Sequence, residues 1–397
     1  AQSAIAQAAT RTDLAPAGRT GDDIVVTAER PIVQMDRTTT TAFVDEREIE
    51  SLPVTDLSEI VNLQAGVVDG HFRGGREGEV QYQVDGVSVN NPYDNKSTLK
   101  LDRSVLQEVQ VIQGTFDAEY GQAMSGVVNA VLRSGDDDRY AFSAETYMGD
   151  YVSPGNDSVV VSSRFLGEQQ VALFPHIDDV DPLTLQNYQA SLSGPVPLLR
   201  NTTFLVNGQR FVDQGHLMGT RLFNPTDSVN FERGYIFPTG DREAVSMDFT
   251  KQWSWLAKLT NRSFDNIQIG YQAIANAIER QGYSHNFRYN PGGAKTAETF
   301  SIVHGLDWTH TLTDRLFYEV NLRQNYFDYR DMKYEDLGTP PAGAGTRYGL
   351  PADSPYYVPG RPLSHGNILD GANLRGVDLG RFVQKTNSFV GKASVTS

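Results

Sequence analysis

Apolar and polar residues alternate with a period of two in eight segments of the chain after residue 138. In Asn266–Ile278, every second residue from Ile267 to Ala277 is apolar, with residues such as Gln268 and Gln272 between them. This period places the two sets on opposite faces of a β-strand, so each segment is predicted to be a strand. The other seven are Tyr140–Met148, Tyr188–Ser193, Thr203–Val212, Trp253–Leu259, Ile302–Trp308, Arg315–Asn325 and Ser388–Val395.

The connections between these strands are alternately long and short. The short ones are 195–201, 261–265 and 313–314, and the long ones are 150–183, 213–250, 280–299 and 329–385. Bacterial outer-membrane barrels have short periplasmic turns and long extracellular loops. A soluble β-sandwich or lectin-like sheet, which is the alternative, has no reason to keep every second loop long. The pattern therefore predicts an antiparallel transmembrane β-barrel.

The predicted barrel is incomplete within this chain. Eight strands close into a tube that their own side chains just fill, so a separate domain could not sit inside it. We therefore expect about 8 strands of a barrel of about 22, with the remaining strands encoded after residue 397.

Residues 36–138 combine short helical and extended patterns and are predicted to form one α+β domain. Helices are expected over Asp45–Leu52 and from an N-cap at Thr55 or Asp56 to near Gly66. The strands are expected over Thr41–Val44, Val80–Val84, Gly86–Val89, Val109–Gln113 and Val127–Leu132.

The first residues of the chain show a different pattern. Residues 1–21 have no apolar period, which is typical of a flexible leader. The run Ile24-Val25-Val26 is β-branched and favours an extended backbone. We interpret Ala1 as a mature N-terminus left by signal-peptide cleavage. The predicted organisation is a leader over 1–35, an α+β domain over 36–138 and the barrel portion over 139–397.

Composition and charge exclude several classes of function. The chain has no cysteine, so disulfides, thiolate metal sites and cysteine nucleophiles are excluded. The net charge of -15 and the pI of about 4.9 argue against nucleic-acid binding. Seven histidines are scattered without a His-Glu-x-x-His motif, and no Gly-x-Ser-x-Gly elbow occurs, so no enzyme is predicted. No cofactor or metal site is predicted, although the acidic extracellular loops leave Ca²⁺ open. The chain contains no apolar run of about 18 or more residues, so no transmembrane helix is predicted.

Several short motifs follow one another between residues 22 and 135. They are Asp23-Ile24-Val25-Val26-Thr27-Ala28, Phe72-Arg73-Gly74-Gly75, Val84-Asp85-Gly86-Val87, Asn91-Pro92-Tyr93-Asp94, Ala118-Glu119-Tyr120-Gly121 and Ser125-Gly126-Val127-Val128-Asn129. In these motifs the chain resembles the TonB box and plug domain of TonB-dependent outer-membrane receptors, above all the Oar-like or carboxypeptidase-regulatory-like subgroup. It departs from that subgroup because residues 1–21 are too short for the small β-sandwich that often precedes the plug.

The resemblance implies roles for particular residues. In the family, the TonB C-terminal domain, energised with ExbB/ExbD, pairs with the box as an added edge strand. The box here is Asp23, Ile24, Val25, Val26, Thr27 and Ala28. Apical plug loops meet substrate in the family, which implies substrate contacts by Arg73, Arg76, Glu77, Asn91, Tyr93 and Asp94. Glu119 and Arg133 are interpreted instead as charges between the plug and the barrel wall.

The resemblance also implies a location and partners. The protein is expected in the bacterial outer membrane, in contact with its lipids and lipopolysaccharide. It is expected to import an unknown substrate with TonB-coupled energy, and a surface lipoprotein partner stays open. Two alternatives remain: an Oar-like outer-membrane protein for protein secretion or surface adhesion, and a soluble β-rich binding protein.

Overall fold

The computed structural model describes most of the chain after residue 39. The described residues are 40–97, 100–114, 120, 123–153, 158–163, 167–172, 177, 180–225, 227–230, 235–313, 316–334, 366–369 and 371–396. The chain divides into two compact units, Ala1–Thr38 and Thr39–Ser397. All described residues belong to the second unit. The leader and its TonB box lie outside the described residues.

The first part of this unit, residues 40–133, contains a five-stranded sheet and is called the N-terminal domain below. The strand order is β1-β6-β7-β4-β5, with β4 and β7 parallel and the other neighbours antiparallel. Each strand overlaps a predicted one, which confirms those predictions. The bounds are β1 Thr40–Asp45, β4 Val80–Val84, β5 Val87–Ser88, β6 Leu106–Gln113 and β7 Gly126–Leu132. A further hairpin, β2 Val67–Val68 with β3 His71–Phe72, was not predicted.

Both predicted helices of this domain are present and slightly shorter than expected. Helix α1, Glu46–Ser51, begins after Asp45, whose side chain accepts a hydrogen bond from the Glu48 amide. Helix α2, Leu57–Asn62, begins after Asp56, whose carboxylate accepts from the Glu59 amide at 3.1 Å. Side-chain oxygens at these positions satisfy amides that have no partner within the helix, so Asp56 rather than Thr55 is the N-cap. Two 3-10 turns complete the domain: η1 Glu77–Glu79 and η2 Arg103–Val105.

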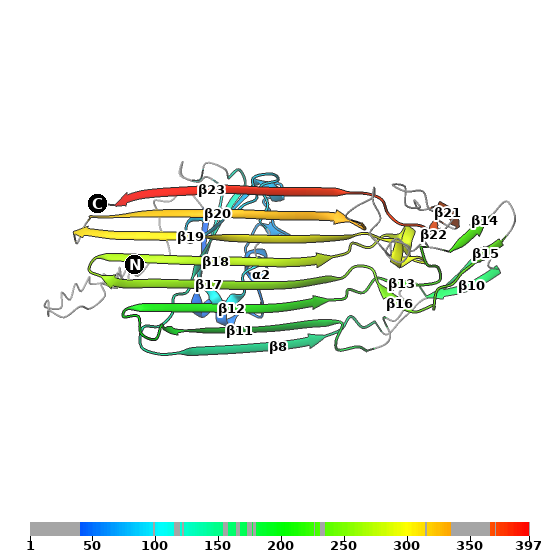
Figure 1. The fold of residues 1–397 in the computed structure, drawn as a ribbon, viewed down its shortest axis with the longest axis horizontal. Coiled ribbons are helices and arrows are strands. Elements are labelled where there is room, and N and C mark those ends of the chain that lie inside the picture. Colours follow the sequence, from blue (N-terminus) through cyan, green and yellow to red (C-terminus); the bar gives the residue numbers. More distant parts are fainter. Residues whose placement is uncertain are drawn as a thin grey trace, which may run out of the picture. The chain divides into compact units, whose positions relative to one another are not determined.

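The second part of the unit is an open antiparallel sheet of eight strands, in the order β23-β20-β19-β18-β17-β12-β11-β8 (Figure 1). Every strand predicted after residue 138 overlaps one of these eight strands. Within this set of eight, each strand pairs with the one before it and the one after it along the chain, as in the wall of an up-and-down β-barrel. The bounds are β8 Ala141–Gly149, β11 Leu185–Pro195, β12 Thr202–Asp213, β17 Thr250–Phe264, β18 Ile267–Arg280, β19 Thr296–Thr313, β20 Leu316–Met332 and β23 Phe382–Thr396.

The long connections carry short elements of their own, which the sequence pattern did not predict. Two small apolar clusters anchor them, one around Phe223 with Leu374 and one around Met247 with Phe287. The elements are β9 Ser158–Ser163, β10 Gly167–Ala172, β13 Met218–Thr220, β14 Ser228–Asn230, β15 Tyr235–Phe237, β16 Ala244–Ser246, η3 His285–Phe287, η4 Pro291–Gly293, β21 Gly366–Leu369 and β22 Ala372–Arg375.

The two faces of the eight-stranded sheet differ in their neighbours. One face, called the inner face, contributes apolar side chains to the buried core of the N-terminal domain: Leu205, Leu256, Ile274 and Val303. The N-terminal domain therefore shares its core with the sheet, which explains why contacts unite both in one unit. The opposite, outer face exposes large apolar side chains: Phe142, Trp253, Trp255, Leu306, Leu322 and Phe389.

No helix in the described part of the chain is both long and apolar enough to cross a membrane.

Candidate functional site

The loop over residues 90–97 is held in one shape by two asparagines. Asn90 is 5% exposed, and its amide donates to the Val80 carbonyl at 2.8 Å and to the Asn95 carbonyl at 2.6 Å. Asn95 has a positive φ of 55°, a conformation that asparagine tolerates well, and its amide donates to the Gly78 carbonyl at 2.6 Å. The loop is thereby tied to Gly78 within η1 and to Val80 at the start of β4, and Tyr93 is 64% exposed.

A cavity of about 980 Å³ lies between this loop, helix α2 and the inner face of the sheet. The sheet contributes the strand ends that lead into the long connections, among them Thr250, Arg280 and Phe382. The N-terminal domain contributes Asn62, Tyr82, Asn91, Tyr93, Asp94, Lys96 and Lys100. The cavity therefore opens on the side of the sheet from which the long connections leave.

Aromatic side chains join the two walls of this cavity. The Phe382 ring lies 6.3 Å from the Tyr93 ring and 5.8 Å from the Tyr329 ring, centroid to centroid. Tyr93 belongs to the loop, whereas Phe382 and Tyr329 belong to β23 and β20, which face the cavity from the sheet. Rings at these separations provide an apolar surface on which a ligand can stack.

Charged and amide groups surround this aromatic cluster. The Lys100 ammonium contacts the Asp56 carboxylate at 3.4 Å and the Ser58 hydroxyl at 3.0 Å. Arg280 forms no ion pair with any described carboxylate. Gln252 and Gln384 add amides from the sheet. A concave site with aromatic rings and a few polar groups is suited to binding a ligand.

The six residues predicted to contact substrate divide into two groups. Asn91, Tyr93 and Asp94 line the cavity. Arg73 and Arg76 do not: the Arg73 guanidinium approaches the Gln113 side chain at 3.3 Å, and Arg76 is exposed beside η1. Glu77 begins η1, and its side chain lies outside the described part of the structure. The pattern of motifs could not separate loops that face the cavity from those that do not, and contact of any of these residues with substrate stays a prediction.

A polar network between the N-terminal domain and the sheet was not predicted. Asp85 and Gly86 both have positive φ, 48° and 76°, and form the turn between β4 and β5. Asp85 accepts hydrogen bonds from the Leu132 amide at 2.9 Å and from the Lys258 ammonium of β17 at 3.2 Å. The Gly86 carbonyl accepts from the Lys392 ammonium of β23 at 3.3 Å. The Val84-Asp85-Gly86-Val87 motif is therefore a contact between the two parts.

Further charges extend this network across the inner face. In the orientation that satisfies its neighbours, the Gln272 amide donates to Asp85 at 2.8 Å and accepts from Arg323 at 2.6 Å. The Arg323 side chain is fully buried and pairs with the Asp307 carboxylate at 2.6 Å. A buried charge is tolerated only where it is paired and hydrogen-bonded, and this network meets that condition.

The interpretation of Arg133 as a charge facing the barrel wall is wrong. Its guanidinium pairs within the N-terminal domain, with Glu46 at 2.5 Å and Glu50 at 2.8 Å. These glutamates lie four residues apart, on one side of α1, and Arg133, which directly follows β7, reaches that side. Arg103 makes the contact to the sheet instead, with Glu145 of β8 at 3.2 Å. Glu119 lies outside the described residues.

Within the described residues, no group of three or more histidine, aspartate or glutamate side chains converges to hold a metal ion.

Comparison with known proteins relates the N-terminal domain to one family. The family model described as "TonB-dependent Receptor Plug Domain" matches residues 33–128. The TonB-dependent transporter Oar of Myxococcus xanthus is 27% identical over 129 residues, which are 29% of this chain and 12% of that protein. The vitamin B12 transporter BtuB of Vibrio vulnificus is 29% identical over 131 residues, which are 29% of this chain and 21% of that protein. The matched segments thus span less than a quarter of either relative.

Solved structures of receptors are also similar. A ferric enterobactin receptor from Pseudomonas aeruginosa aligns over 88% of this chain and 45% of its own, with 13% identity and a TM-score of 0.49. A siderophore receptor from the same organism aligns over 73% of this chain and 44% of its own, with 14% identity and a TM-score of 0.45.

The match of residues 33–128 to the plug family agrees with both named transporters, and the eight-stranded sheet supplies the wall on which such a plug rests. The chain therefore belongs to the TonB-dependent receptors of the bacterial outer membrane, with a plug domain followed by strands of its β-barrel.

Proposed function

We propose that this receptor imports a substrate across the outer membrane, with energy supplied through TonB. The observation that carries the proposal is the cavity between plug loop 90–97 and the inner face of the barrel strands, on the side of the long connections. In an outer-membrane barrel this side faces the exterior. A ligand arriving from outside therefore enters the cavity that Asn91, Tyr93 and Asp94 line.

The coupling step is assigned to the TonB box, Asp23, Ile24, Val25, Val26, Thr27 and Ala28. Its β-branched residues favour an extended backbone, which can add as an edge strand to the sheet of the TonB C-terminal domain. A pull on this segment reaches the plug through β1, which pairs with β6 in the plug sheet from Thr40 to Asp45. ExbB/ExbD supply the energy to TonB in this proposal.

Deleting residues 22–28 tests the assignment. The deletion is expected to abolish uptake while substrate binding to whole cells stays unchanged, because the cavity lies elsewhere in the chain. A panel of ferric siderophores, cobalamin, glycans and peptides identifies the substrate for both assays. Uptake that survives the deletion would overturn the coupling role.

The cavity is tested in the same assays by Tyr93→Ala. Loss of the ring is expected to weaken binding by about tenfold, the scale of one stacking contact. Tyr188→Ala is the matched control, because Tyr188 is 39% exposed on the outer face, away from the cavity. Equal binding by both variants would place the substrate site elsewhere.

The alternative role in protein secretion or surface adhesion makes a different prediction. A secretion or adhesion protein would show no TonB-dependent uptake of any member of the panel, while its loss would change the set of exported or surface-attached proteins.

A further inference from the structure

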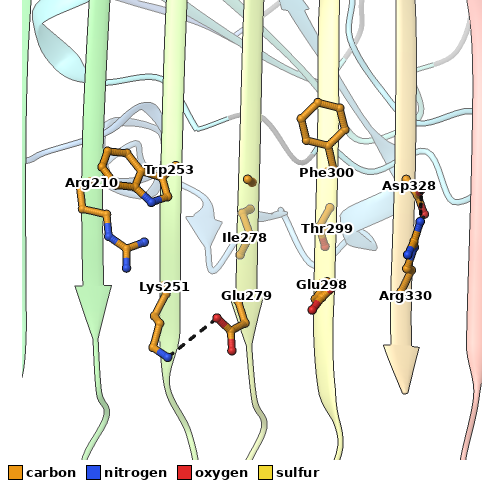
Figure 2. Close-up of a pocket in the computed structure, with 11 residues that line it drawn as sticks. Arg210, Lys251, Trp253, Ile278, Glu279, Glu298, Thr299, Phe300, Asp328 and Arg330 are labelled. Carbon is orange, nitrogen blue, oxygen red and sulfur yellow. Dashed lines mark hydrogen bonds and ion pairs between the residues drawn. The ribbon is translucent and has the colours of Figure 1, made fainter. Parts of the chain in front are cut away.

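A polar pocket of about 390 Å³ lies on the outer face of the sheet, near the strand ends that lead into the long connections (Figure 2). Successive side chains of a strand point to opposite faces, and the residues of this pocket point away from the plug, apart from Ile278 and Thr299, which also line the cavity beside the plug. On β17, Lys251 and Trp253 alternate with Gln252 and Leu256, and Leu256 belongs to the core shared with the plug. The pocket therefore faces away from the plug.

Strand register arranges the charges of this pocket in two rows. In the row nearer the long connections, Lys251, Glu279, Glu298 and Arg330 are successive cross-strand neighbours. In the next row, Arg210, Trp253, Ala277, Phe300, Asp328 and Lys385 are successive neighbours. Figure 2 shows the side chains of both rows from β12 to β20; Lys385 of β23 lies beyond the pocket residues drawn there.

Most of these charges are already paired. Lys251 lies 3.8 Å from the Glu279 carboxylate, and Arg330 and Lys385 lie 3.1 and 3.4 Å from the Asp328 carboxylate. Arg210 differs, because its guanidinium lies over the Trp253 ring at 5.0 Å and forms no ion pair with a described carboxylate. Its hydrogen bond to the Gln252 carbonyl, at 3.4 Å, leaves other N–H groups free to bind an anion.

The half of the pocket that favours an anion is therefore well defined. Arg210 and Lys251 lie on adjacent strands, β12 and β17, and both project outward. Glu279 and Glu298 face each other across β18 and β19 and repel an anion from the other half. A planar guanidinium beside an ammonium is well suited to bind a phosphate group.

The surface beyond the charged rows is apolar. The Trp253 and Trp255 rings are stacked, with centroids 5.8 Å apart, and further along the strands Leu306, Leu322 and Phe389 are 51%, 55% and 77% exposed. Aromatic girdles mark the level at which an outer-membrane barrel leaves the hydrocarbon region. The charged side chains of the pocket thus lie at the level of the lipid headgroups. The apolar side chains further along the strands lie at the level of the acyl chains.

We propose that Arg210 and Lys251 bind the phosphate of a phosphorylated lipid in the outer leaflet, with its acyl chains against Trp253, Trp255 and the apolar face below. This inference rests on the outer-membrane location of the family and is independent of import. A free phosphate ion would use the same two cations, but it would gain nothing from the apolar surface.

Lipid binding to the purified full-length receptor tests the proposal. Native mass spectrometry in detergent would measure retention of bis-phosphorylated lipid A and of the same lipid after removal of its phosphates. The receptor is expected to retain the phosphorylated lipid and to release the dephosphorylated one. Arg210→Gln with Lys251→Gln is expected to lower the affinity for the phosphorylated lipid by about tenfold or more, because two charge-assisted contacts are lost.

The matched control is Arg200→Gln with Arg262→Gln, which removes the same charge near the short turns at the other end of β12 and β17. It is expected to bind lipid like the unaltered receptor. Arg210→Lys keeps the charge but loses the planar fork, so an intermediate affinity is expected. Circular dichroism checks that all variants keep their β-sheet content.

Three outcomes would overturn the proposal. The first is equal retention of the phosphorylated and dephosphorylated lipids. The second is equal loss of affinity in both double variants. The third is displacement of the lipid by inorganic phosphate at equal concentration, which would show a simple anion site instead of a lipid site.

Discussion

The Asp85 carboxylate contacts three strands, one in the plug and two in the barrel sheet. It accepts from the Leu132 amide inside the plug and from Lys258 and Gln272 on the barrel strands. The Lys258 side chain is only 14% exposed, so its ammonium depends on this carboxylate for compensation of its charge. The turn motif that contains Asp85 is thus both a hairpin and a contact that holds the plug against the wall.

Asp85→Ala is therefore expected to be strongly destabilising. It leaves the Lys258 ammonium buried without its partner, which costs about 3 kcal/mol in the free energy of unfolding. Chemical unfolding of the detergent-solubilised receptor measures the change. Adding Lys258→Met to Asp85→Ala should recover part of the loss, because no uncompensated charge remains.

Lys251→Met is the control for this pair, because Lys251 makes an exposed pair with Glu279 on the outer face. Its effect should stay below about 1 kcal/mol. If Asp85→Ala costs no more than Lys251→Met, the plug contact assigned to Asp85 is not a stabilising one.

A second plug carboxylate, Asp102, should make stability depend on pH. It is 2% exposed; one oxygen accepts from the Ser104 amide at 2.7 Å, and the other has no partner among the described groups. Burial raises the pKa of Asp102 above its usual 3.8. The folded state then holds the proton more tightly than the unfolded state, so this group favours folding below pH 3.8. That contribution is lost as the pH rises from 3.8 through the raised pKa.

Asp102→Asn is expected to remove this dependence, because the amide keeps the acceptor for Ser104 and carries no charge. Its melting temperature should match that of the unaltered receptor near pH 3.5 and exceed it at pH 7, by the equivalent of about 1 kcal/mol. A difference that does not change with pH would contradict the titration of Asp102 as its cause.

At the scale of elements, the outer face of each long strand should tolerate only apolar residues at mid-height. Leu306 of β19 is 51% exposed and has Tyr271 and Leu322 as its cross-strand neighbours. Leu306→Arg would place a charge in the hydrocarbon region, at a cost of about 2–4 kcal/mol. The fraction of receptor assembled in the outer membrane, measured by heat-modifiable gel mobility, should fall.

Leu198→Arg makes the same chemical change in the short turn between β11 and β12, where the side chain is fully exposed. Its assembly should be unaffected. Assembly that is equally good for both variants would show that the face bearing Leu306 does not contact lipid.

The long strands could be predicted because each repeats its period many times, as Ile267 to Ala277 does in β18. The hairpin of Val67–Val68 with His71–Phe72 could not, because two residues carry no period. Arg133 shows a related limit: its partners Glu46 and Glu50 are more than eighty residues away, and only the fold brings α1 close to the residue that follows β7.

The candidate site was predictable on the plug side alone. The motif Asn91-Pro92-Tyr93-Asp94 is contiguous in sequence and identified its loop. The opposite wall gathers Arg280, Tyr329 and Phe382 from three strands, and only the register of the sheet brings these residues together. The network of Lys258 and Arg323 could not be predicted for the same reason. The sequence of a strand does not show which of its charged side chains face the plug.

At the scale of the whole molecule, the inner face of the barrel strands shares a core and a charge network with the plug. In the proposed account, the outer face of these strands contacts lipid and loop 90–97 of the plug faces the exterior. The proposed import requires one further connection, from the TonB box to the periplasmic partner. That connection is the central claim, and it can be measured without knowing the substrate.

The most direct test is isothermal titration calorimetry, in which the purified TonB C-terminal domain is titrated into the full-length receptor and the heat of binding is measured. Saturable binding is predicted for the unaltered receptor and for Ala6→Pro, which places a proline outside the box. Val25→Pro removes a backbone donor from the added strand and should weaken binding by about tenfold or more, and deletion of residues 22–28 should abolish it. Binding by the deletion variant as tight as that of the unaltered receptor would contradict the account.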